Sequence, residues 1–557
     1  MIDIQKRLQT LFGKERLIFW YDDNAALKAE FEEVEIEGVE KRVIENNEFT
    51  LKRELLKLKP DTKFLIYSPT MAPSPENNWL LDLNIANHMF SADKISLILQ
   101  SLGLDVNFKL FMARFEKFLN ANKRVDALSG KIGLSESETS LALKMIAVTI
   151  NSDDNIESIL LKLFENQKQY EALEKLELTG ELFKAVKSKY GYDGESLNDL
   201  LYKLLQNHFY YTIDRSKSSL NSDARLFINS WMDSSRYKES FKYISNNVSD
   251  ELHIKGILEG IEPKRVLHCD TYEKCDQVVI GYLLKQLFSH SHTEEIIDSI
   301  HTRKNTFWYE YYKNIYNAIL SAAKLIDFAN KTEYKIKDFG DGISKYVADW
   351  HKADMYYREY STYASRAEKL ELLKDLTSKI EDMYLNGYLR ELNDTWQKHS
   401  ETYDVNYIDN HQQKFYGSYI GPIVEKNKKI FVIISDAMRY ECGVELTSKI
   451  LAENKKKDRF SAACSHMVSS LPSYTQLGMA SLLPHRSLSI GDKNDTVFVD
   501  DKSSAGMANR DKILKSYNEN SVAIGYEEFI GLDKGEGREF AKNHQVIYIY
   551  HDEIDKM

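Results

Sequence analysis

The sequence predicts a multidomain protein that combines α/β and α structure. We expect a small N-terminal α/β domain at residues 1–104, a long helical middle region at 105–410 and a C-terminal α/β domain at 411–557. Length is the first reason, because 557 residues allow three or four domains at roughly 150 residues each. The second is that short apolar runs rich in β-branched residues occur near both ends, with helical patterns between them, as in parallel sheets.

The third observation is where the prolines lie. Seven of the eight fall into two clusters, at 60–75 and 422–484, and only Pro263 lies between them. Because an interior proline costs a helix ~3 kcal/mol, the interval permits long helices. Apolar residues at 156–164 recur at helical spacing, and no repeat of fixed period is present. The aromatic-rich stretch at 350–363 is interpreted as packing between helices.

Composition excludes several classes of protein. Hydrophobic residues make up 43% and charged residues 29%, which is typical of globular proteins. No stretch approaches the ~20 apolar residues that span a membrane, and the N-terminus lacks the apolar segment of a signal peptide, so we predict a cytoplasmic protein. Four cysteines are too few for a disulfide framework. The net charge of −11 argues against a general nucleic-acid coat, but a local basic groove leaves DNA as a possible partner.

The N-terminal domain is predicted from three segments of strand character. Residues 16–21 and 63–68 each read as one strand, and 34–44 as one or two short strands. Helical stretches separate these segments, which favours a small parallel sheet.

The C-terminal domain begins with the apolar run IFVII at 430–434, which predicts a buried strand. Further strands are expected at 496–499, 521–524 and 546–550, with a helix in each interval. Asp436 then lies at the carboxyl end of a central strand, where open α/β sheets bind their ligands. A carboxylate there is an expected metal ligand.

Acidic and imidazole side chains follow the last of these strands. His551, Asp552 and Asp555 come after 546–550, so we expect them at the same sheet edge as Asp436. A second candidate feature is Thr475, at the start of an apolar helical segment. A hydroxyl residue there is either a helix N-cap or a nucleophile held where helix amides favour an anion.

Two segments carry a resemblance to a known family. VIISDAMRYE at 432–441 and SSLPSYTQLGMASLLPH at 469–485 resemble the PglZ proteins of bacterial BREX phage-defence systems, which carry a domain similar to the alkaline phosphatase superfamily. The resemblance implies a metal-dependent phosphohydrolase of the phosphodiesterase or nuclease type. It also implies two divalent metal ions, zinc or manganese, which would clamp the attacking and leaving oxygens.

The resemblance assigns roles to individual residues. Thr475 is the preferred nucleophile, because the small residue Ser481 follows six positions later and an apolar pair comes after it. Ser470 is the alternative, since Ser470-Leu471-Pro472 matches the nucleophile-x-Pro order of some relatives. The implied metal ligands are the five residues Asp436, Thr475, His551, Asp552 and Asp555. Arg439 would bind phosphate bidentately, with a helix-surface ion pair as the alternative.

The sequence departs from the superfamily pattern in two ways. His551 and Asp555 stand in the reverse of the usual Asp-x-x-x-His order, and a later Asp-His pair and a further His are missing. We therefore predict a C-terminally truncated chain with an incomplete metal site and no activity. Two functions stay open: a phosphohydrolase component of a BREX system, or a non-catalytic assembly and sensor subunit. The implied partners are other BREX proteins, including the methyltransferase and a small accessory protein at the N-terminal domain.

Overall fold

The computed structural model describes residues 4–90, 94–289, 293–400, 404, 408–454, 460–491 and 495–556. The chain divides into two compact units, Met1–Cys275 and Asp276–Met557, and each is described by itself. The predicted mixture of helical and α/β structure is present, and most residues are helical. None of the described helices is both long and apolar enough to cross a membrane.

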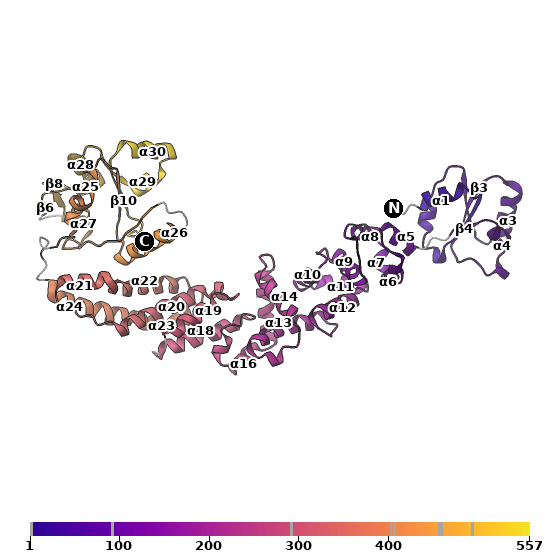
Figure 1. The fold of residues 1–557 in the computed structure, drawn as a ribbon, viewed down its shortest axis with the longest axis horizontal. Coiled ribbons are helices and arrows are strands. Elements are labelled where there is room, and N and C mark those ends of the chain that lie inside the picture. The colour runs from indigo at the N-terminus through magenta and orange to yellow at the C-terminus, as the bar shows by residue number, and fades with distance from the viewer. Residues whose placement is uncertain are drawn as a thin grey trace. The chain divides into compact units, whose positions relative to one another are not determined.

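The first unit begins with a parallel sheet of strand order β2-β3-β1-β4 (Figure 1). Its strands are β1 (Leu17–Tyr21), β2 (Val39–Val43), β3 (Lys63–Ser68) and β4 (His88–Phe90). The strands predicted at 16–21 and 63–68 are confirmed, and the segment 34–44 contains one strand. β4 was not predicted, because three residues carry too little apolar pattern.

Successive side chains of β1 point to opposite faces of the sheet, and both faces are buried. Ile18 and Trp20 belong to one hydrophobic cluster, whereas Leu17 and Phe19 belong to another. Helix α1 packs on the first face, and α3 and α4 supply residues to the second. The helices of this domain are α1 (Ile4–Phe12), α2 (Lys28–Glu33), α3 (Glu48–Arg53), α4 (Leu81–Ala86) and α5 (Lys94–Ser101).

From residue 106 to residue 400 the described part of the chain contains helices and no strand, as the proline distribution predicted. Several helices follow a capping side chain that accepts a hydrogen bond from a first-turn amide, such as Ser137, Asn155 and Ser196. In the first unit these helices are α6 (Lys109–Ala113), α7 (Glu116–Leu119), α8 (Asn122–Ser129), α9 (Glu138–Ile150), α10 (Ile156–Glu165), α11 (Lys168–Lys175), α12 (Thr179–Tyr190), α13 (Leu197–Ile213), α14 (Ser222–Asp233), α15 (Lys238–Glu251), α16 (Ile254–Glu259) and α17 (Pro263–Val266).

The second unit contains a group of helices in which α20 and α22 lie side by side (Figure 1). Aromatic residues of the stretch predicted to pack between helices are buried, including Trp350 and Tyr360. The helices are α18 (Glu273–Phe288), α19 (Thr293–Arg303), α20 (Tyr309–Lys331), α21 (Phe339–Lys345), the π-helix η6 (Tyr346–Trp350), α22 (His351–Ser365), α23 (Lys374–Asp382), the π-helix η8 (Met383–Leu389) and α24 (Arg390–Ser400).

The remainder of this unit is built on a parallel sheet of order β5-β10-β9. Its strands are β5 (Ile430–Ser435), β9 (Ser521–Gly525) and β10 (Val546–His551), which confirms the strands predicted at 430–434, 521–524 and 546–550. The strand predicted at 496–499 exists as β7 (Val497–Val499). Its expected place in the same α/β pattern is wrong, because it pairs antiparallel with β6 (Leu488–Ile490) and β8 (Lys502–Ser503).

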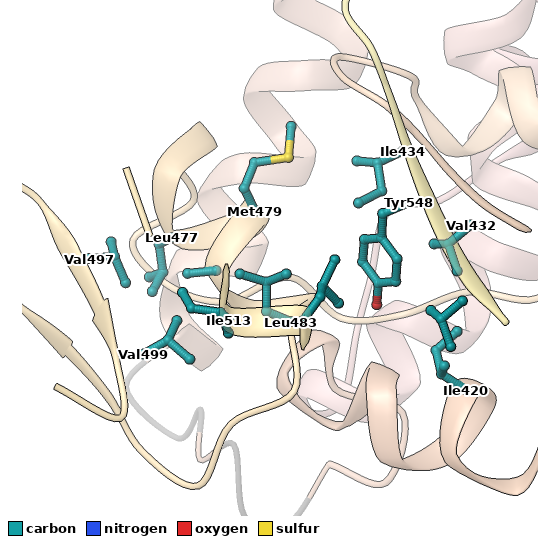
Figure 2. Packing of buried hydrophobic residues seen from close by; sticks show 13 residues of the cluster. Ile420, Val432, Ile434, Leu477, Met479, Leu483, Val497, Val499, Ile513 and Tyr548 are labelled. Atoms are coloured by element: carbon teal, nitrogen blue, oxygen red, sulfur yellow. The ribbon is translucent and has the colours of Figure 1, made fainter. Parts of the chain in front are cut away.

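Helix α27 connects the two sheets of this region through the hydrophobic core (Figure 2). Leu477, Met479 and Leu483 lie between Val497 and Val499 of β7 and the side chains of β5 and β10. Tyr548 projects from β10 into this core, and its hydroxyl donates to the carbonyl of Leu482 at 2.8 Å. The helices here are α25 (Gly421–Glu425), α26 (Tyr440–Asn454), α27 (Thr475–Ser481), α28 (Met507–Tyr517), α29 (Tyr526–Gly531) and α30 (Lys534–Asn543).

Candidate functional site

The carboxyl ends of β5 and β10 bring two candidate ligand segments together. Ser435 and His551 are register partners, and the Asp436 amide donates to the carbonyl of His551 at 2.9 Å. The Ser435 hydroxyl and His551 Nδ1 are also 2.9 Å apart, so the imidazole is held by a hydrogen bond. Asp436 and Asp552 therefore follow adjoining strands at one edge of the sheet.

The turn after β5 is backbone-strained. Ala437 has a φ of 59°, in the left-handed region that residues with a Cβ rarely adopt. Its amide donates to Asp436 Oδ1 at 2.9 Å, which holds the carboxylate against the turn. Such strain persists only where the surrounding structure enforces it, and it is concentrated at functional sites.

Arg439, the residue assigned to phosphate, lies in an ion pair with the helical part of the unit. Its Nη2 is 3.2 Å from Asp354 Oδ1 on α22, and its Nε is 3.6 Å from Glu441 Oε1. Burial alone would lower the pKa of Arg439, but the Asp354 carboxylate and the Tyr384 hydroxyl raise it above its ordinary value. The ion-pair alternative therefore describes this structure, although Arg439 lies just before α26 and its partner Asp354 is on α22. Half of the Arg439 side chain stays exposed.

Asp354 is the centre of this arrangement. Its side chain is only 2% exposed and accepts hydrogen bonds from the hydroxyls of Tyr346 at 2.7 Å, Tyr384 at 2.6 Å and Tyr388 at 3.3 Å. Burial and the nearby carboxylate raise the pKa of all three tyrosines, so the hydroxyls stay protonated as donors. A buried charge needs such partners, because removing it from water is costly.

A second set of charges binds the start of α26 to α22. Arg358 Nη2 lies 2.6 Å from Glu445 Oε2, and Arg358 Nε lies 3.7 Å from the fully buried Glu441. Neither Asp354 nor Arg358 was predicted to be a site residue. The available signal was an acid and a base four positions apart in an aromatic-rich helix, a spacing that puts both on one face.

The two candidate nucleophiles have different environments. Thr475 is the first residue of α27, its side chain is exposed, and its hydroxyl makes no hydrogen bond to a residue that the structure describes. The N-cap position is occupied by Tyr474, so Thr475 does not serve as the cap. Ser470 is 2% exposed, and its hydroxyl lies 2.7 Å from that of Ser481, which in turn donates to Leu477.

The remaining predicted ligands lie near the surface. Asp552 forms an ion pair with Lys556 at 3.0 Å, and the hydrogen bond from Lys556 lowers the pKa of Asp552. Asp555 is exposed. Among the residues described, no three or more His, Cys, Asp or Glu side chains are grouped so as to hold a metal ion. The predicted ligands do not by themselves fit a metal centre.

Comparison with known proteins identifies this region. Residues 415–557 form an alkaline phosphatase-like domain, which is the class that the strand-end acid and the helix-opening hydroxyl suggested. More narrowly, these residues match the family described as the BREX system PglZ alkaline phosphatase-like domain, and they are called the PglZ domain below.

The similarity to PglZ proteins extends over nearly the whole chain. The alkaline phosphatase-like protein PglZ of Bacillus cereus (strain H3081.97) is 28% identical over 596 aligned positions, covering 99% of this chain and 68% of the relative. The alkaline phosphatase-like protein BrxZ of Escherichia coli O9:H4 (strain HS) is 29% identical, covering 98% of this chain and 68% of the relative. No solved structure matches the chain.

Proposed function

We propose that this chain is a BREX component whose PglZ domain is a phosphohydrolase of the phosphodiesterase or nuclease type. The observation that carries the proposal is the match of residues 415–557 to an alkaline phosphatase-like domain, on a parallel sheet with acidic residues at one edge. Open α/β sheets bind ligands at that edge.

Thr475 is the proposed nucleophile. Its exposed hydroxyl is available to attack a phosphorus atom, whereas the hydroxyl of Ser470 is buried and already engaged with Ser481. In the step that follows from this assignment, the Thr475 oxygen forms a bond to phosphorus, its proton passes to water, and the leaving oxygen departs. Asp436 is the proposed principal carboxylate ligand of the site, and the Ala437 amide holds it by a hydrogen bond.

We propose that the site uses two divalent metal ions, zinc or manganese. When bound, they would neutralise the charge that develops on the phosphoryl group. Asp436, Thr475, His551, Asp552 and Asp555 are the proposed ligands, yet the described residues form no metal-binding group, so further donors are required.

The test is an assay of phosphodiester hydrolysis on bis-p-nitrophenyl phosphate and plasmid DNA with added zinc or manganese. The assay includes a longer form of the chain that supplies the further metal donors. We expect hydrolysis by this form to be lost in Thr475→Ala and retained in Ser470→Ala. Equal loss in both variants would argue against Thr475. Absence of hydrolysis with every metal would leave this chain without the proposed activity.

A second function does not depend on a metal centre, and the described residues form no metal-binding group. The chain would then act as an assembly and sensor subunit that binds other BREX proteins, including the methyltransferase and a small accessory protein, with DNA as another candidate. Co-purification of this chain with those proteins, unchanged in Thr475→Ala, is the expected result for this function.

A further inference from the structure

A pocket of about 400 Å³ lies within the second unit, with walls from two separate parts of the chain. One wall comes from α21, η6 and α24, and includes Phe339, Tyr346 and Trp396. The opposite wall comes from the PglZ domain and includes Tyr440 and His466. The volume falls within the usual range of small-molecule sites, roughly 300–1,000 Å³.

The first wall is aromatic and held in place by a glycine. The rings of Phe339 and Trp396 are 4.8 Å apart between centroids. Gly342 lies directly against the indole, because a Cβ on it would come within 2.4 Å of Trp396 Cζ3. Tyr346 and Tyr440 also line the pocket, with ring centroids 6.1 Å apart and ring planes inclined by 50°. Both parts of the lining therefore contribute aromatic rings.

Polar groups among the apolar lining are few. Asn393, His466 and Ser469 contribute an amide, an imidazole and a hydroxyl, each able to donate and accept hydrogen bonds. Arg439, next to Tyr440 in the chain, keeps about half of its side chain exposed after pairing with Asp354. Aromatic walls with a few hydrogen-bonding groups are the arrangement by which proteins hold an unpaired base.

The PglZ wall belongs to the same segments as the proposed catalytic residues. Tyr440 follows Asp436 by four positions, and Leu471, another lining residue, precedes Thr475 by four. The pocket lining and the proposed catalytic residues therefore share the same two chain segments.

We propose that this pocket binds the nucleobase of a nucleotide phosphoester, with the helical wall setting the substrate class. The proposal rests on the proposed function, because it names the substrate of that same site. It makes the helices α21 and α24 part of the substrate site and gives Trp396 the role of a stacking residue.

The experiment measures binding of adenosine, adenosine 5′-monophosphate and ribose 5-phosphate to the intact chain by calorimetry. We expect saturable binding of the two probes that carry a base and none of ribose 5-phosphate. Trp396→Ala should weaken binding about tenfold, since stacking on one aromatic side chain contributes ~1–3 kcal/mol per base. Trp79→Ala, which alters an exposed tryptophan of the first unit, is the matched control and should bind as the original chain does.

A second variant tests the pocket independently in case Trp396→Ala does not fold. His466→Ala changes the opposite wall and should weaken binding of both base-carrying probes. Equal binding of ribose 5-phosphate, or unchanged affinity in both wall variants, would overturn the proposal.

The outcomes separate this inference from the proposed function. Thr475→Ala should abolish hydrolysis and leave adenosine binding unchanged. Base-dependent binding without any hydrolysis supports the pocket and contradicts the phosphohydrolase. Hydrolysis without base-dependent binding supports the phosphohydrolase and contradicts the nucleobase pocket.

Discussion

The guanidinium of Arg439 lies 3.2 Å from the carboxylate of Asp354, a residue 85 positions earlier in the chain. This contact joins the segment that follows β5 to helix α22. The segment therefore has two roles: Asp436 is at the sheet edge, and Arg439 with Glu441 binds the helices. The contact therefore links the segment that contains Asp436 to α22.

Replacing Asp354 should loosen the start of α26. Asp354→Ala removes the carboxylate that accepts from Arg439 and three tyrosine hydroxyls, and the lost hydrogen bonds to buried groups should cost about 1–3 kcal/mol. We expect faster amide hydrogen exchange in the first turns of α26 and in α22. The control is Asp349→Ala, whose half-exposed pair with Lys352 contributes about 0.5 kcal/mol at most. Unchanged exchange in Asp354→Ala would contradict the assigned network.

The two candidate nucleophiles should differ in their effect on stability. Ser470→Ala breaks a buried hydrogen bond to Ser481 and should lower the free energy of unfolding by about 1 kcal/mol. Thr475→Ala removes an exposed hydroxyl and should change it by less than about 0.5 kcal/mol. Denaturant unfolding followed by circular dichroism measures both. A larger loss in Thr475→Ala would mean that its hydroxyl has a structural role.

A methyl group on Gly342 should displace the Trp396 ring. Because the added Cβ would lie 2.4 Å from the indole, Gly342→Ala should destabilise the second unit by about 1–3 kcal/mol. Gly281→Ala, in the interior of α18 with open space around its Cα, should stabilise by up to about 1 kcal/mol. Thermal unfolding monitored by tryptophan fluorescence distinguishes the two, and a stabilised Gly342→Ala would refute the close approach.

Acid should weaken the loop between β7 and β8. Burial raises the pKa of Asp500, but hydrogen bonds from Tyr517 and from the amides of Ser487 and Arg486 lower it to about 2. Because this pKa is depressed, the ionised Asp500 carboxylate stabilises the folded state fully above the ordinary value of 3.8. This stabilisation is lost as the pH falls towards 2. After allowance for solvent screening the effect is about 1 kcal/mol. Asp500→Asn should remove this part of the pH dependence, as measured by unfolding between pH 5 and pH 2.

The four thiols should react at different rates with a thiol reagent. Cys464 is exposed, whereas Cys269 and Cys275 are fully buried with their sulfur atoms 3.6 Å apart. Burial raises the pKa of the partly buried Cys442, which lowers its thiolate fraction. The Cys464 thiol should therefore react quickly in the native protein, and this rapid reaction should be absent from Cys464→Ser. Rapid reaction of three or more thiols would contradict the burial of Cys269 and Cys275.

Strand prediction succeeded where a long apolar run met a clear boundary. The run at 430–434 and the one at 546–550 became β5 and β10, because buried parallel strands require continuous apolar sequence. The segment 496–499 was correctly predicted as a strand but assigned to the wrong sheet. Its antiparallel pairing with β6 and β8 depends on those neighbouring segments and not on its own residues.

The sequence by itself determined the strand-end position of Asp436 and the helix-opening position of Thr475, because both follow from local apolar patterns. Only the tertiary structure decided that Arg439 pairs with Asp354 and that Trp396 and Tyr440 line the same pocket. Those contacts join residues far apart in the chain, and no local propensity encodes which helix face will meet which loop. They arise when burial of apolar surface brings the helices and the PglZ domain together, and buried charges must then find partners there.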